Sequence, residues 1–259
     1  MVTTRGAMPT VTPPEPRIKR LTESQYLNSI ADIFSADIAV TTQIDPLEES
    51  NGSYAIGAGV STISPLGIER FETAAYQVAA QAMEDTEVRN RWIACEPEAT
   101  RDDECAAESL TALGLRVWRR PLDTEEVDGL VEIAGNAATV LDDFHLGFEY
   151  AIAALLQSPH FLYRIEVGEA DEEGYRYDNY EMASRLSYYL WNTTPDAELL
   201  LAAENGELTT TDGLEFQVDR MLDDDRIRHG MRAFFTDMLD LHELDDLTKD
   251  PLIFLYMSD

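Results

Sequence analysis

The sequence FHLGFEYAIAALLQ at residues 144–157 is the most apolar run of helical length in this chain. A helix that is apolar around most of its circumference is normally buried. We therefore expect this segment to be the central helix of the fold, with the other helices packed around it. The sequence SPHFLYRIE at 158–166 follows directly, and we expect it to leave the core in an extended conformation.

The segments on either side of this run have the periodicity of amphipathic helices. Residues 103–118 form one such segment, and it should end at WRRPL because Pro121 disfavours helix at the residue before it. Asp123 and Glu126 then give a capping-box pattern for a helix at 124–140. We expect further helices at 22–34, 65–85, 180–191 and 226–240, with shorter ones at 197–206 and 214–224. The sequence thus predicts an all-α fold, an irregular multi-helix bundle of about eight to ten helices with little or no sheet.

The charge of the chain limits its partners. Among 259 residues, 50 are acidic and 19 are basic, which gives a formal net charge of −31. Such a surface repels phosphate groups, so we expect no nucleic-acid partner. No apolar run approaches the roughly 20 residues that span a bilayer. Residues 1–20 are expected to be a flexible leader without an export signal, which places the chain in the cytoplasm if the start is natural and outside it if the start is truncated.

The two cysteines, Cys95 and Cys105, lie in CEPEATRDDEC. Their spacing fits neither a CxxC redox pair nor a c-type haem attachment site. A local disulfide is the use that we favour, and two independent reduced thiols are the alternative. None of the four histidines has a partner at the helical spacing of metal ligands, so we predict no metal site in this chain.

Two short motifs carry the candidate site residues. Arg119 and Arg120 follow a predicted helix end, where they can bond exposed carbonyls or grip an anionic ligand. His160, Arg164 and Glu166 put titratable and charged groups into an apolar stretch just after the central helix. Because a buried charge needs a partner, we expect Glu166 to pair with one of the two arginines. A structural ion-pair network is the favoured interpretation, and a ligand-binding or catalytic site is the alternative.

The motifs resemble a known combination of bacterial modules. RLTESQYLNSIADIF, WRRPLDTEEV, LLQSPHFLYRIE and ASRLSYYLWNTTPDAELLLAAENGEL with a closing QVDRML resemble, in order, proteins built from domains of unknown function 1587, 1595 and 1592. Such proteins are typical of planctomycetes and myxobacteria and are often linked to planctomycete-type cytochrome c domains. The resemblance implies modules at 21–90, 95–166 and 174–259, the last one truncated.

The resemblance also implies a compartment and partners. Relatives carry a cysteine pair ahead of the arginine motif, which supports the disulfide and an extracytoplasmic location. Cytochrome c or other redox domains are the implied partners, and haem c would belong to modules missing here, because this chain has no CxxCH. The leading hypothesis is a non-catalytic helical module of a cytochrome-linked protein. The alternative is a part of an oxidoreductase that acts with haem domains of the complete protein.

Overall fold

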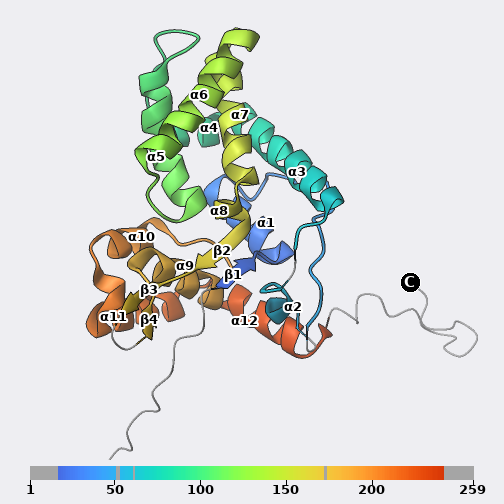
Figure 1. The fold of residues 1–259 in the computed structure, drawn as a ribbon, viewed down its shortest axis with the longest axis vertical. Helices are drawn as coiled ribbons and strands as arrows, with labels where there is room; N and C mark the ends of the chain where they lie inside the picture. The colour runs from blue at the N-terminus through green and yellow to red at the C-terminus, as the bar shows by residue number, and fades with distance from the viewer. Residues whose placement is uncertain (1–16, 51–52, 61, 172–173, 242–259) are drawn as a thin grey trace, which may run out of the picture.

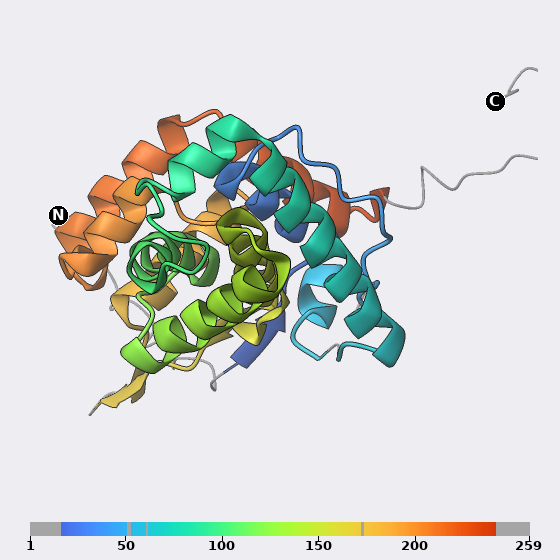
Figure 2. The same cartoon turned by 90° about the horizontal axis from the view of Figure 1, so that it is seen from above.

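The central helix lies where the sequence predicts it. A computed structural model describes residues 17–241 except 51–52, 61 and 172–173. Helix α7 (Phe144–Gln157) packs against α6 (Thr124–Leu141), α3 (Pro65–Glu84) and α5 (Asp103–Trp118), as Figures 1 and 2 show. At its closest approach to α6, a side chain in place of Gly147 would collide with the Ala134 carbonyl. The two helices therefore pack backbone against backbone at this point.

The prediction of an all-α fold is confirmed. The described residues contain twelve α-helices, ten of them with at least seven residues, and only two small pairs of strands. The helices not named above are α1 (Glu23–Ile33), α2 (Tyr54–Gly57), α4 (Thr86–Trp92), α8 (Pro159–Leu162), α9 (Asn179–Leu190), α10 (Ala197–Glu204), α11 (Thr211–Asp223) and α12 (Ile227–Met238), with a 3₁₀ turn η1 (Glu207–Thr209).

Capping explains why several helices start where they do. The predicted capping box of Asp123 and Glu126 is present, and Thr22 with Gln25 forms a second one. Helix α4 was not predicted, because Asp85 both ends α3 and caps α4 by accepting bonds from two backbone N–H groups. One residue thus ends α3 and starts α4, so α4 lies directly after the end of the helix predicted at 65–85.

The strands correct two expectations. Strand β1 (Arg17–Arg20) pairs antiparallel with β2 (Tyr163–Glu166), so the end of the predicted leader is ordered by residues far along the chain. The segment 158–166 is not extended throughout, because Ser158 caps and Pro159 starts the short helix α8 before β2 begins. A second ribbon joins β3 (Glu169–Asp171) to β4 (Gly174–Arg176). The rest of the leader, 1–16, and the closing segment, 242–259, lie outside the described residues.

The apolar side chains form two cores. The larger core joins α1, α3, α5, α6, α7 and α8 and reaches Tyr188 on α9. The smaller core surrounds Trp191 at the end of α9 and includes Leu199, Leu208 and Met221 from α10, η1 and α11. In Figure 1 the two cores occupy the upper and lower parts of the molecule, and β1, β2 and α8 lie where the parts meet. The candidate residues cluster at this junction.

Candidate functional site

The two cysteines are joined, which confirms the predicted disulfide between Cys95 and Cys105. The bond closes the loop between α4 and α5. Asp102 within this loop accepts a hydrogen bond from the backbone of Cys105 at the start of α5. The disulfide therefore fixes the start of the helix whose other end carries Arg119.

Arg119 is a buried anchor for the turn that follows the central helix. It ends α5 in a left-handed conformation with φ 62°, and its side chain is 3% exposed. Its guanidinium donates to the carbonyls of His160, Phe161 and Tyr163 and to the Tyr188 hydroxyl. Pro121, two residues later, prevents α5 from continuing and so lets the Arg119 side chain turn inward. Arg119 thus bonds backbone carbonyls, as one interpretation of the motif predicts.

Arg120 points the other way, into a half-exposed cluster. Its two terminal nitrogens bind both oxygens of Glu126, at 2.9 Å and 2.7 Å. These hydrogen bonds hold the pKa of the Glu126 carboxyl at about 2. His160 lies 3.2 Å from Arg120 and packs against Trp118, with 4.9 Å between the ring centroids and 40° between the ring planes. Burial and the neighbouring Arg120 lower the pKa of His160, so the ring is neutral at neutral pH.

The prediction that Glu166 pairs with Arg119 or Arg120 is wrong. Glu166 is 3% exposed and pairs with Arg185 at 2.8 Å, and Lys19 of β1 lies 3.7 Å from the same oxygen. Neither Arg119 nor Arg120 contacts it, because the first binds backbone carbonyls at 160–163 and the second binds Glu126. Its other oxygen, Oε1, is buried and has no hydrogen-bond donor among the described residues.

Arg164 lies on the same face of β2 as Glu166, since side chains two residues apart in a strand point to one side. It is half-buried, and its guanidinium carbon lies 5.6 Å from the centre of the Tyr188 ring. Within the described part of the chain, Arg164 has neither a hydrogen-bond acceptor nor an ion-pair partner, and its Nε is buried. Burial lowers the pKa of this guanidinium, while Glu166 opposes the effect. The other four candidate residues therefore form two groups, Arg120 with His160 and Arg164 with Glu166, and Arg119 belongs to neither.

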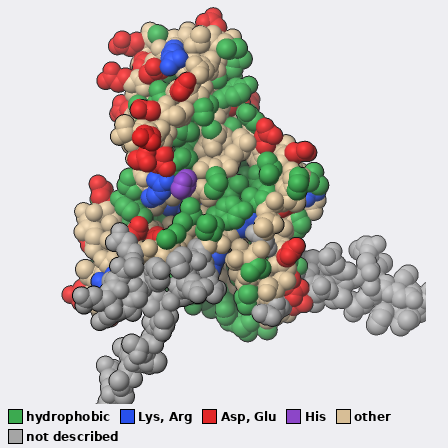
Figure 3. All heavy atoms as spheres, viewed as in Figure 1, with side chains coloured by type: hydrophobic (Ala, Val, Ile, Leu, Met, Phe, Trp, Pro, Cys, Tyr) green, Lys and Arg blue, Asp and Glu red, His purple; other side chains and the backbone are tan. Residues whose placement is uncertain are grey.

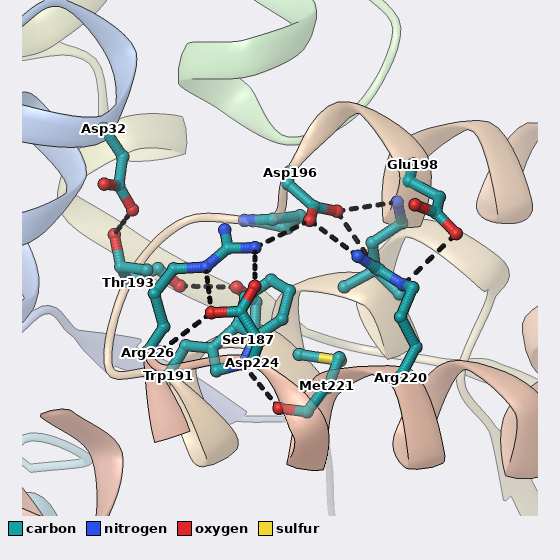
Figure 4. Close-up of polar contacts among 12 residues, drawn as sticks. Asp32, Ser187, Trp191, Thr193, Asp196, Glu198, Arg220, Met221, Asp224 and Arg226 are labelled. Carbon is teal, nitrogen blue, oxygen red and sulfur yellow. Dashed lines mark hydrogen bonds and ion pairs between the residues drawn. The ribbon is translucent and has the colours of Figure 1, made fainter. Parts of the chain in front are cut away.

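A second polar cluster, which the sequence analysis did not find, surrounds the buried turn 192–196. Asp196 accepts hydrogen bonds from Arg220 and Arg226, and Figure 4 shows its carboxylate between the two guanidiniums. Burial alone would raise the pKa of Asp196, but the bonds from Arg220 and Arg226 lower it. Arg226 also stacks on Trp191, 3.5 Å from the ring centre, and binds Asp224.

The same turn is held from the other side by the first helices. Thr193 donates to Asp32 of α1, and Asn28 of α1 donates to the carbonyl of Asn192. Arg116 of α5 donates to the carbonyl of Pro195. The sequence offered two signals for this cluster. One is the Trp-Asn-Thr-Thr-Pro-Asp turn, and the other is the pair of arginines within the acidic segment 219–226. Its residues bind one another, and the cluster fastens α9–α12 to the rest of the protein.

Cavities and metal ligands do not point to another site. One surface hollow, beside Asp37 and Gln81, is lined by none of the five candidate residues. The described residues contain no group of three or more His, Cys, Asp or Glu side chains placed to hold a metal ion. No helix among them is long and apolar enough to cross a membrane.

The fold and these contacts define a disulfide-linked, predominantly helical protein whose turns are fastened by buried arginines. Three family models match the chain in sequence order. Each model is described as a protein of unknown function. DUF1587 matches residues 19–84, DUF1595 matches 105–166 and DUF1592 matches 177–259. The chain belongs to the family of proteins that combine these three domains. No curated protein and no solved structure matches it.

Proposed function

We propose that the chain is a non-catalytic helical module of an extracytoplasmic, cytochrome c-linked protein, where it packs beside redox domains. The contacts of Arg119 are the observation that carries this proposal. Its donors are used by backbone carbonyls and by Tyr188, so the residue at the centre of the arginine motif holds the fold together. A catalytic arginine would instead leave donors directed at a substrate.

The disulfide supports the proposed location. Disulfides persist in oxidising compartments and are rare in the bacterial cytosol, where thiols are kept reduced. The Cys95–Cys105 bond closes a short loop at the start of α5. Exported protein would form it where a thiol oxidant accepts the two electrons that the two cysteines lose.

Exposed apolar side chains support packing against another domain. On α12, Phe234 is 52% exposed and Met238 is 57% exposed, and Met231 and Phe235 are also open. Figure 3 shows apolar side chains gathered at the lower edge of the molecule, over α12. An apolar face of this kind is unusual on a free-standing monomer, and it suits a module with a neighbouring domain.

The test uses the exported, oxidised chain and a separately produced c-type cytochrome domain. Calorimetry should detect binding for the wild type and for Tyr189→Asp, which alters an exposed ring on α9. Binding should be lost in Phe234→Asp while the melting temperature stays unchanged. Equal binding by both variants would refute the proposed face. The oxidoreductase alternative would be favoured by a different result. In that case the haem would be reduced only when the chain is present, and His160→Gln would abolish the reduction.

A further inference from the structure

We propose that α12 pairs antiparallel with α12 of a second copy of this chain, which makes a symmetric dimer. The inference begins with the apolar stripe of the helix, because its centre is open to solvent. Four exposed side chains share one side of α12 and form this stripe: Met231, Phe234, Phe235 and Met238. A row of exposed apolar side chains on one side of a surface helix normally marks a face that another protein covers.

The contacts within the chain hold α12 by a different side. The helix packs on α9 and beside α2 (Figure 1). Gly230 lies so close to the carbonyl of Leu190 that a side chain at this position would collide with it. Asp237 accepts hydrogen bonds from the hydroxyl of Ser53 and from the backbone N–H of Tyr54. These contacts fix the helix without covering the stripe, so each chain holds α12 in place by itself.

The order of residues along the stripe is symmetric. Outward in either direction from the point between Phe234 and Phe235, the chain has a phenylalanine, two residues outside the stripe and then a methionine. A twofold axis through this point, perpendicular to the helix, places Met231 of one chain beside Met238 of the second copy. A twofold interface requires such a self-complementary patch, because both chains use the same surface.

The charges of α12 favour the antiparallel orientation. Arg228 and Arg232 lie in the N-terminal half of the helix, Asp240 follows its C-terminal end, and all three are exposed. This distribution opposes the dipole of the helix, whose N-terminus is partly positive and whose C-terminus is partly negative. Asp225 pairs with Arg228, but both side chains are almost fully exposed, so this pair contributes little. In an antiparallel dimer each basic half lies beside the negative end of the other helix.

The dimer should be weak and reversible. One helix from each chain gives an interface at the small end of specific interfaces. The net charge of −31 on each chain also opposes association, although salt screens charges that lie more than about 8 Å apart at physiological ionic strength. We therefore expect a dissociation constant in the micromolar range. The dimer does not rest on the proposed redox partner, but both use α12, so a second copy and a redox domain would exclude each other.

Sedimentation equilibrium of the full, oxidised chain tests the dimer without any cytochrome domain. With rising concentration, the apparent mass should increase from that of one chain towards twice that value. Tyr189→Asp, which changes an exposed ring on α9, should behave like the wild type. Phe234→Asp should weaken association at least about tenfold, because it places two carboxylates beside the twofold axis.

Two results of this measurement would overturn the dimer. A wild-type mass that stays that of one chain at every concentration would do so, and calorimetry with the cytochrome domain would still decide the redox partner separately. Equal association by Phe234→Asp and the wild type would place any dimer on another surface. Binding of monomeric wild type, but not of Phe234→Asp, to phosphatidylcholine vesicles would assign the stripe to a lipid surface instead.

Cysteine pairing tests the antiparallel register. A mixture of Met231→Cys and Met238→Cys chains should form a mixed disulfide, because these positions face each other across the twofold axis. Neither variant should link efficiently to itself, since like positions lie about 10 Å apart along the helix axes, too far for a disulfide. Tyr189→Cys is the exposed control and should not link. Linking of Met231→Cys to itself would indicate parallel helices and overturn the proposal. If Phe234→Asp does not fold, the mixed disulfide decides.

Discussion

Replacing Arg119 by Met should destabilise the protein more than any other single arginine substitution in the two motifs. The change removes the donor to the carbonyls of His160, Phe161 and Tyr163 while keeping an unbranched apolar side chain. Each buried carbonyl left without a partner costs about 1–3 kcal/mol. Part of this loss is offset because Met does not bury a charge. We therefore expect a net loss of about 3–5 kcal/mol in the free energy of unfolding.

The neighbouring arginine provides the matched control. Arg120→Met removes a pair with Glu126 in which both side chains are partly exposed, at 33% and 21%. Such pairs contribute about 0–1 kcal/mol. Urea unfolding of the oxidised protein, followed by circular dichroism, measures both variants under the same conditions. A melting temperature lowered by roughly 10 °C would accompany the expected loss in Arg119→Met. A loss below about 1 kcal/mol, or one no larger than that of Arg120→Met, would refute the anchoring role.

Three further predictions concern the same region. Glu166→Gln should lower the free energy of unfolding by about 3 kcal/mol in urea titrations, because it removes the carboxylate that binds Arg185; an unchanged midpoint would contradict this. The pKa of Glu126 is about 2 in the folded protein and near 4.5 when unfolded, so its stabilising effect is complete above pH 4.5 and is lost as the pH falls towards 2. The difference in stability between wild type and Glu126→Gln should shrink over that range, and a constant difference would count against the pairing. Reduction of Cys95–Cys105 should cost about 2–3 kcal/mol, and intact-mass analysis should detect no free thiol before it.

Features set by short-range sequence were predictable. The C-terminal end of α5 and the start of α6 follow from Pro121, Asp123 and Glu126, which act on residues close to them in the sequence. The apolar run at 144–157 identified the central helix because burial on nearly all sides leaves a composition that no surface helix has. Local chemistry therefore specified most of the helices.

Features set by distant contacts were not predictable from one sequence. The partner of Glu166 is Arg185, which comes from α9 and reaches the carboxylate only after α9 packs on β2. Strand β1 has four residues and no alternating pattern strong enough to stand out; it is a strand because β2 pairs with it. The cluster at Asp196 likewise needs Arg220 and Arg226 from later helices.

The pairing of β1 with β2 has a consequence for biosynthesis. Arg17 pairs with Glu166, so the first described strand has no partner until nearly 150 further residues have been made. At a bacterial synthesis rate of about 5–20 residues per second, that interval is on the order of 10–30 s. During it the nascent chain cannot close its ribbon, although Arg20 can already bind the Asp45 carboxylate and the carbonyls of Pro46 and Thr62. The β1–β2 ribbon is thus completed late in translation, after the helices α3–α7 between its two strands have been made.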